Sequence, residues 1–226
     1  MSSDVRPAAP AVSSIKMIRT LAGVAVMSGF LIVLTVKATE ARIDTNKREA
    51  LEAAVFAVLP DATTQATFEL RDGAFVRVDP PTSGFDRVYA GYGPDGRLVG
   101  VAIEAAGMGY AGTIRTLYGY DPETQAVVGL QVIESLETPG LGDRIAKDPA
   151  FLANFEQLDV SLDETGETLA NPVTFVKAGE KSRMWEVEGI SGATISSKAV
   201  AAMLDARSAE ILPLVMRRLD ELKEAR

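Results

Sequence analysis

The sequence predicts an α+β protein in which an N-terminal transmembrane helix precedes an antiparallel-sheet domain with flanking helices. Three observations predict this class: a run of 17 uncharged residues near the N-terminus, two successive strand-turn-strand patterns in the middle of the chain, and apolar residues at helical spacing on either side of them. With 226 residues, 47% of them hydrophobic, the chain is long enough for one membrane anchor and one domain with a substantial core.

The N-terminal region predicts a tail and an anchor. Residues 1–14 are rich in Ala, Pro and Ser without apolar periodicity, which predicts a disordered tail. Residues 15–38 contain the uncharged run from Thr20 to Val36, which reaches the lower limit of the ~17 to 25 residues that span a bilayer as a helix. A cleaved signal peptide is the alternative, but the run exceeds an h-region of about 7 to 15 residues, so an anchor is favoured. Basic residues lie on both sides of the run, so the positive-inside rule does not orient it.

A connecting helix is predicted over residues 39–60. Asp44 or Thr45 is a suitable cap for a helix that runs to about Leu59, where Pro60 stops it. One face of that helix carries a stripe of apolar residues, which are Leu51, Ala54, Val55, Val58 and Leu59. We expect this helix to lead the chain into a domain that comprises residues 61–226.

The first half of that domain is predicted to be a sheet. Residues 61–86 should hold one or two strands with loops. Two hairpins follow, with strands over residues 86–92 and 97–105 and then over residues 113–120 and 126–135. The sequences between the paired strands, Gly93-Pro94-Asp95-Gly96 and Asp121-Pro122-Glu123-Thr124, are typical of turns. Successive hairpins indicate an antiparallel sheet.

The second half of the domain is predicted to be mixed. A short helix over residues 148–155 should pack its Phe and Leu side chains, and the acidic residues 158–172 should form a surface loop. Two further strands are predicted over residues 173–177 and 184–187, with Glu186 and Glu188 on a solvated strand face. A helix over residues 199–211 follows, and Pro213 is expected to interrupt it before residues 214–223 continue.

Composition excludes several kinds of site. The chain has no Cys and no His, which removes disulfides, thiolate nucleophiles, iron-sulfur ligands and His-based zinc or haem sites, and we predict no metal site. The net charge of −8 divides into +4 over residues 1–48 and −12 over the remainder, and such an acidic domain argues against nucleic acid. An electron carrier in this chain would have to be organic, and a flavin fits because it needs only N–H groups, hydroxyls and apolar walls.

A glycine-bearing loop of small residues, residues 186–198, leads into the C-terminal helix. Unpaired N–H groups at a helix start and the helix dipole favour a bound phosphate. Hydroxyls surround this position, and Lys198 adds a cation; the hydroxyl residues are Ser191, Thr194, Ser196 and Ser197. An ordinary Ser/Thr helix cap is the alternative interpretation.

Three blocks in this order resemble one known family. They are Gly109-Tyr110-Ala111-Gly112-Thr113-Ile114-Arg115, Glu137-Thr138-Pro139-Gly140-Leu141-Gly142-Asp143 and Ser191-Gly192-Ala193-Thr194. The last is similar to the flavinylation motif of the FMN-binding domain family, and the second resembles that family's Glu-Thr-Pro-Gly-Leu-Gly signature. The resemblance covers roughly residues 90–205. The family includes the G subunit of the Rnf electron-transport complex and the C subunit of sodium-translocating NADH:quinone reductase. Of these two subunits, this chain resembles the Rnf G subunit more.

The resemblance implies FMN attached to Thr194 through a phosphoester. A Thr hydroxyl is a poor nucleophile without a base, and no His or Cys is present, so the resemblance also implies a flavin transferase that moves FMN from FAD onto this chain. It further implies an electron-relaying subunit without catalytic residues of its own, in a complex of the bacterial inner membrane, with the flavin domain on the extracytoplasmic (periplasmic) side. Partners would be the other subunits.

The remaining cofactor contacts are expected from the loop and from the turn at residues 137–142, with Leu141 against the ring. They are Tyr110, Glu137, Thr138, Leu141, Gly142, Ser191, Gly192, Ala193, Ile195, Ser196, Ser197 and Lys198. Further candidates for stacking on the ring are Tyr118, Tyr120 and Trp185. Ser135 and Leu136 stand where relatives often have His.

Three alternatives remain besides an Rnf-type subunit. The chain could be the C subunit of the sodium-translocating reductase. It could instead be an anchored module that binds an anionic ligand without redox chemistry. An enzyme that uses the carboxylates of Glu137 and Asp143 is disfavoured, because nothing in the sequence fixes a second partner for them.

Overall fold

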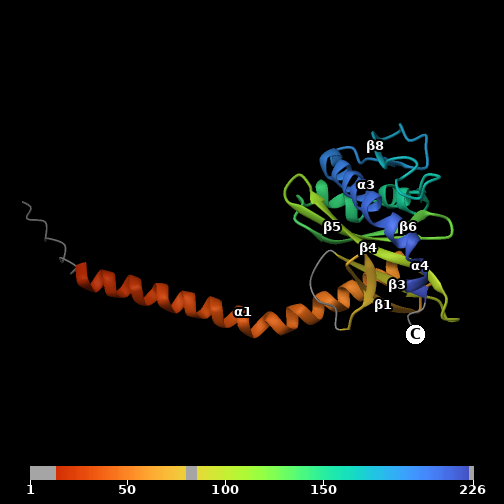
Figure 1. Cartoon of the computed structure of the whole chain (residues 1–226). Coiled ribbons are helices and arrows are strands. Elements are labelled where there is room, and N and C mark those ends of the chain that lie inside the picture. The colour runs from red at the N-terminus through yellow and green to blue at the C-terminus, as the bar shows by residue number, and fades with distance from the viewer. Residues whose placement is uncertain (1–13, 80–85, 224–226) are drawn as a thin grey trace, which may run out of the picture. The chain divides into compact units, whose positions relative to one another are not determined.

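The computed structural model describes residues 14–79 and 86–223, and these divide into an N-terminal unit that ends at Glu49 and a domain of residues 50–226. The predicted tail lies outside the described residues except for Ser14, which begins helix α1 (Ser14–Val58) (Figure 1).

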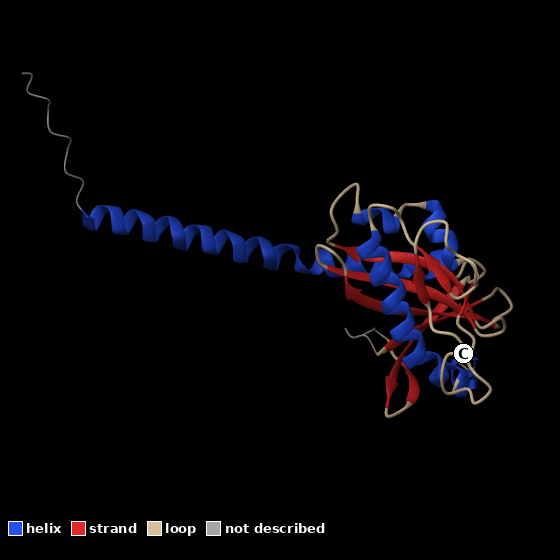
Figure 2. Cartoon of the chain, turned by 90° about the horizontal axis from the view of Figure 1, so that it is seen from above, coloured by secondary structure: helices blue, strands red, loops and turns tan. Residues whose placement is uncertain are grey.

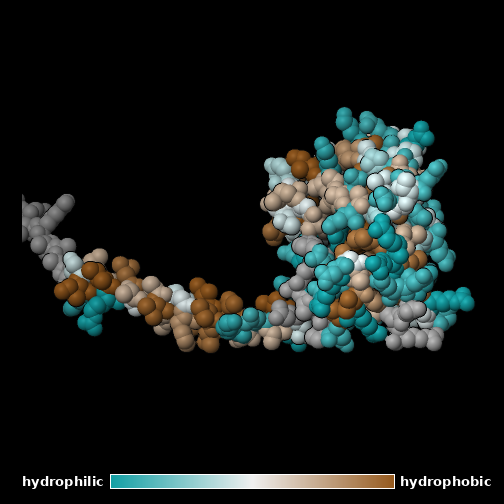
Figure 3. Space-filling view, viewed as in Figure 1, coloured by the Kyte–Doolittle hydropathy of each residue, from teal (hydrophilic) through white to brown (hydrophobic). Residues whose placement is uncertain are grey.

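Helix α1 carries the predicted anchor. It is the one helix among the described residues that is long and apolar enough to cross a membrane, and its apolar side chains are exposed along the N-terminal unit (Figure 3). The predicted helix start at Asp44 or Thr45 is wrong, because α1 passes through both positions without a break, and the Thr45 hydroxyl donates to the Ala41 carbonyl within the helix at 2.9 Å. No Gly or Pro lies between residues 30 and 59, so nothing in the sequence breaks the helix there.

The domain is built on a seven-stranded sheet in the order β2-β1-β3-β4-β5-β6-β7, in which every pairing is antiparallel. Figure 2 shows the strands of the domain in red and its helices in blue. Both predicted hairpins are confirmed as β3-β4 and β5-β6, and residues 61–86 contain the predicted strands. The strands are β1 (Thr64–Arg71), β2 (Ala74–Arg77), β3 (Arg87–Tyr92), β4 (Leu98–Met108), β5 (Thr113–Asp121), β6 (Ala126–Ser135) and β7 (Leu158–Asp159).

One face of the sheet packs against the end of α1. Val55, Val58 and Leu59 are buried there beside side chains of β3, β4 and β5. The backbone approaches so closely that a Cβ at Gly119 would overlap with the Val58 carbonyl oxygen. Glycine on β5 is therefore what lets the last turn of α1 lie on this face.

The opposite face packs against helix α3 (Thr194–Arg217), which runs across the sheet in Figure 1. The prediction that Pro213 interrupts this helix is wrong, since α3 continues to Arg217 before a separate helix α4 (Leu219–Lys223). Pro213 is buried with Leu212 and Val215, and burial of that apolar surface offsets the hydrogen bond that proline cannot make.

The remaining elements lie between β6 and α3. They are η1 (Gly142–Ala146), α2 (Pro149–Leu152), η2 (Ala153–Phe155), β8 (Thr174–Val176) and β9 (Glu186–Glu188). The short helix predicted over residues 148–155 is confirmed as α2 and η2, with the Asp148 carboxylate accepting from the N–H groups of Ala150 and Phe151. Strands β8 and β9 match the two predicted strands, but they form a separate parallel pair.

Two predictions in this region need correction. Residues 158–172 are not only a surface loop, since Leu158 and Val160 are completely buried and β7 pairs with β6. Glu186 and Glu188 are only half-buried, but their carboxylates face backbone N–H groups as well as solvent. The Glu186 carboxylate accepts from the N–H groups of residues 182 and 183, and that of Glu188 accepts from the Gly179 N–H, so both order the connection between β8 and β9.

Candidate functional site

The loop before α3 presents a helix start with unused donors. Gly192 has a φ of 88°, a conformation that favours glycine, and Thr194 is the first residue of α3. Within the described chain no group accepts from the N–H groups of Thr194, Ile195 and Ser196, and no side chain caps the helix. The alternative interpretation, an ordinary Ser/Thr helix cap, is therefore wrong, and these donors remain for an anion.

The turn at residues 138–141 faces this helix start. Gly140 has a φ of 79°, and the Leu141 N–H donates to the Thr138 carbonyl at 3.2 Å, which agrees with the type II turn that the Thr-Pro-Gly-Leu sequence favours. The Asp143 carboxylate accepts from the Gly140 N–H at 2.6 Å and so holds the turn.

Glu137 lies buried beneath this turn, with only 7% of its surface exposed. Its Oε1 atom accepts from the Tyr110 N–H at 2.6 Å, whereas its Oε2 atom is buried and has no partner among the described residues. A Cβ at Gly109 or Gly142 would overlap with this carboxylate, so the side chain occupies space that two glycines leave open.

These segments line one cavity of about 300 Å³ that is open to solvent. Apolar groups from Leu141 and Ile195, each about half exposed, line it together with the exposed ring of Tyr110. The full lining is Tyr110, Glu137, Thr138, Leu141, Gly142, Gly192, Ala193, Thr194, Ile195 and Ser196. Ten of the thirteen predicted site residues are thus brought together.

Three of the predicted site residues are not part of the lining. Ser197 is completely buried and turned inward, where its hydroxyl donates to the Ala193 carbonyl and accepts from the Ile190 N–H. The Ser191 side chain and Lys198 are exposed outside the cavity. The loop therefore offers backbone N–H groups rather than a Lys cation to an anion.

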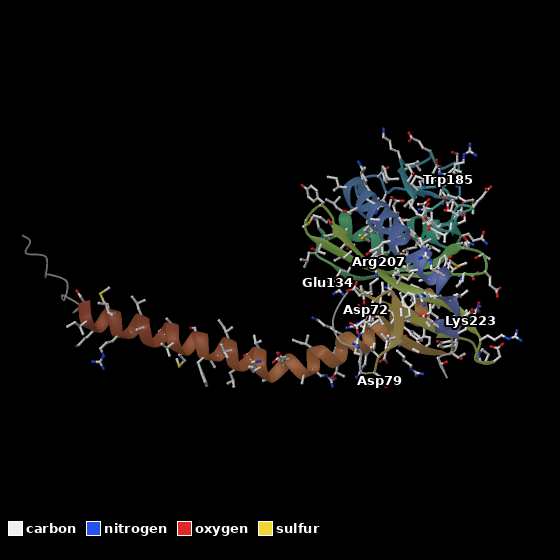
Figure 4. All side chains as sticks on the ribbon, viewed as in Figure 1. Asp72, Asp79, Glu134, Trp185, Arg207 and Lys223 are labelled. Atoms are coloured by element: carbon white, nitrogen blue, oxygen red, sulfur yellow. The ribbon has the colours of Figure 1, made fainter. Side chains whose placement is uncertain are left out.

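The stacking candidates beyond Tyr110 lie elsewhere. Tyr118 and Tyr120 are completely buried in the core, where desolvation raises the pKa of both. Trp185 lies beside β8 and β9, with the Arg183 guanidinium 5.7 Å from its ring centroid (Figure 4). They are core and surface residues, and the expectation that they could stack on a ligand here is wrong.

Two residues that shape this site, Arg144 and Gly109, were not among the contacts predicted from the sequence. Arg144 donates to the Ser191 carbonyl at 3.1 Å and to Asp148 at 2.7 Å, and so ties the loop to the segment before α2. Gly109 gives room to the Glu137 carboxylate. The only feature of the sequence that points to Arg144 is its position directly after the block that ends at Asp143.

Ser135 and Leu136 are not part of the cavity lining. The Ser135 hydroxyl accepts from the Glu137 N–H at 3.2 Å, and Leu136 packs over Gly112 with two thirds of its surface exposed. Among residues 14–79 and 86–223, no group of three or more acidic, His or Cys side chains is arranged to hold a metal ion.

The part of the chain that forms this cavity matches a known protein family. A family model described as the FMN-binding domain matches residues 109–207, which include every residue of the lining. The G subunit of the ion-translocating oxidoreductase complex of Methanosarcina acetivorans is 31% identical over 84% of this chain and 89% of that protein. The protein of the same name from Cereibacter sphaeroides is 30% identical over 84% of each chain.

A solved structure shows the same fold. The crystal structure of Shewanella oneidensis NqrC matches with a TM-score of 0.60 and 20% identity, over 80% of this chain and all of that one. The class of protein is therefore one with an FMN-binding domain after an apolar N-terminal helix. Within this class, the chain belongs to the family of G subunits of ion-translocating oxidoreductase complexes.

Proposed function

We propose that this chain is a membrane-anchored flavoprotein subunit that relays electrons through FMN held as a phosphoester on Thr194. The observation that carries the proposal is that Thr194, the first residue of α3, lines one cavity with the Glu137 to Gly142 segment. The names of the relatives, which are subunits of ion-translocating oxidoreductase complexes, support a relay between subunits rather than a stand-alone enzyme.

The residues present fit FMN. The unused N–H groups at residues 194–196 and the positive end of the α3 dipole suit a phosphate. Leu141, Ile195 and Tyr110 supply apolar surface for a flat ring. The buried and unpartnered Oε2 of Glu137 suits a hydrogen-bond donor, which a flavin also carries.

Attachment of FMN requires a second protein. The Thr194 oxygen would form a bond to the FMN phosphorus of FAD while the pyrophosphate bond breaks, AMP leaves, and the transferase takes the hydroxyl proton. No His or Cys exists in the chain to act as the base, which supports an external flavin transferase. When bound, FMN supplies the redox chemistry, and the chain holds the phosphate, orients the ring and limits its access to water.

The attachment is tested by denaturing the protein after co-expression with a flavin transferase. We expect flavin fluorescence to migrate with the wild-type chain and to disappear in Thr194→Val. Thr174→Val is the matched control, because it makes the same change at an exposed threonine of β8 outside the cavity, and it should keep the label. A label that survives Thr194→Val contradicts the assignment.

We further propose a single span by residues 15–38 with the FMN domain on the extracytoplasmic side of a bacterial inner membrane. Helix α1 is long and apolar enough to support this. Because the chain has no Cys, a single cysteine at the exposed Thr124 can be labelled without background. A membrane-impermeant maleimide should label Thr124→Cys in intact spheroplasts, and protection until lysis would reverse the orientation.

A further inference from the structure

The two carboxylate oxygens of Glu137 have different surroundings. Oε1 accepts a short hydrogen bond from the Tyr110 N–H, 2.6 Å away, while Oε2 is shielded from water and accepts nothing from the described residues. A buried acceptor without a partner is unfavourable, and such atoms in folded proteins usually face a ligand, an ion or a water molecule.

The position of this carboxylate is fixed. Its backbone N–H donates to the Ser135 hydroxyl, and the side chain lies where a Cβ at Gly109 or Gly142 would overlap with it. The side chain therefore has little room to turn its free oxygen elsewhere.

The basic groups nearest in the chain are already engaged. Arg144 donates to Ser191 and Asp148, and Lys147 pairs with Asp143 at 2.8 Å. No hydroxyl of the lining donates to Glu137 within the described chain. The missing donor is thus expected from whatever fills the cavity that Glu137 lines.

We propose that Glu137 Oε2 accepts a hydrogen bond from the flavin and thereby positions it. This inference rests on the proposed function. A flavin offers N–H at the ring and hydroxyls on the ribityl chain as donors, and a carboxylate accepts either strongly. If the donor is the ring N–H, the negative charge beside it would also disfavour the electron density that the ring gains on reduction, and Glu137 would then keep the reduction potential low.

Glu137→Gln tests the proposal with little change in shape. Its amide oxygen can keep the bond from the Tyr110 N–H, while its NH₂ group replaces the Oε2 acceptor with a donor. Glu134→Gln is the matched control, because it also removes one negative charge from this segment, and its side chain is 57% exposed and paired with Arg115 at 3.2 Å.

The measurements compare flavin-loaded and unloaded forms of each variant. Loading with flavin should raise the thermal unfolding midpoint of both proteins. The rise should be smaller in Glu137→Gln than in wild type, with a difference of about 3 °C or more between the two rises. A ring donor should also raise the midpoint potential by about 30 mV or more, a tenfold change in the two-electron equilibrium. A ribityl donor should leave the potential nearly unchanged. Glu134→Gln should match wild type in both measurements.

Several outcomes overturn the proposal. Equal thermal gains for wild type and Glu137→Gln contradict it while leaving the proposed function intact. A wild-type chain that carries no flavin contradicts the proposed function itself. If unloaded Glu137→Gln does not fold, Glu137→Asp replaces it as the test variant. Its shorter side chain keeps the negative charge but moves the acceptor oxygen away from the flavin. A thermal gain on loading as large as that of wild type would then contradict the assignment.

Discussion

Arg144 joins two parts of the site through one planar side chain. It donates to the Ser191 carbonyl, in the loop before α3, and to Asp148, which caps α2, and this pairing lowers the pKa of Asp148. The loop that presents Thr194 is therefore held from outside the cavity.

Arg144→Met should loosen that loop. We expect a loss of about 1 kcal/mol in stability, because the side chain is 43% exposed and water screens its ion pair. Hydrogen exchange should become faster at the amides of Ile190, Ala193 and Ser197, whose N–H groups are hydrogen-bonded within this loop. Lys147→Met is the control, since it breaks an exposed ion pair with Asp143 without a bond to the loop, and exchange there should stay as in wild type.

Sequence patterns predicted the residue types of the site better than their orientations. Thr194, Leu141 and Glu137 line one cavity, as the two motifs imply. The inward turn of Ser197 was not predictable, because it depends on the position of the Ile190 N–H in the folded loop. The burial of Glu137 likewise depends on Gly109, which is remote in the sequence.

At the scale of elements, strand prediction succeeded where a turn sequence marked the ends. Strand β6 has the predicted bounds, residues 126–135, because Asp121 to Thr124 supply a turn before it. Strand β7 has only two residues, so its pairing with Ala126 and Val127 depends on tertiary packing. The turn that joins β1 to β2 is Asp72-Gly73, and both residues have positive φ. Asp-Gly is a typical hairpin turn sequence, but it was not used to predict this hairpin.

The contact between α1 and β5 should not tolerate an added methyl group. Gly119→Ala would push its Cβ into the Val58 carbonyl oxygen, and we expect a loss of about 1–3 kcal/mol in the free energy of unfolding. Urea denaturation measures this loss. Gly29→Ala, where nothing lies within 4 Å, is the control and should leave the urea midpoint unchanged.

The turn after residue 162 should respond to acid. Hydrogen bonds from the Thr165 and Thr168 hydroxyls and nearby N–H groups lower the pKa of Asp163 to about 2. Because the folded-state pKa is depressed, the stability this carboxylate contributes is present above its unfolded pKa of about 3.9 and is lost as the pH falls toward 2. In Asp163→Asn the unfolding midpoint should depend less on pH between about 4 and 2. An unchanged pH dependence would contradict the role of this turn.

At the scale of the whole molecule, the last turns of α1 belong to the core of the domain. Val55, Val58 and Leu59 are at most 1% exposed, and each contributes about 1.5–3 kcal/mol by burial. Without them the domain would lose much of a typical stability of about 5–15 kcal/mol.

A chain that begins at Ala50 should therefore fold, whereas one that begins at Ala62 should be unfolded or aggregate. Circular dichroism and gel filtration measure the difference. A well-folded monomer beginning at Ala62 would show that the end of α1 is dispensable.

The walls of the cavity also set an order of maturation. Tyr110, Glu137 and Thr194 come from distant parts of the chain, and Thr194 leaves the ribosome last. The cavity is complete only when the start of α3 is in place, so a flavin bound in it would mark molecules whose synthesis and folding are complete. The yellow fraction of a preparation would then count finished molecules.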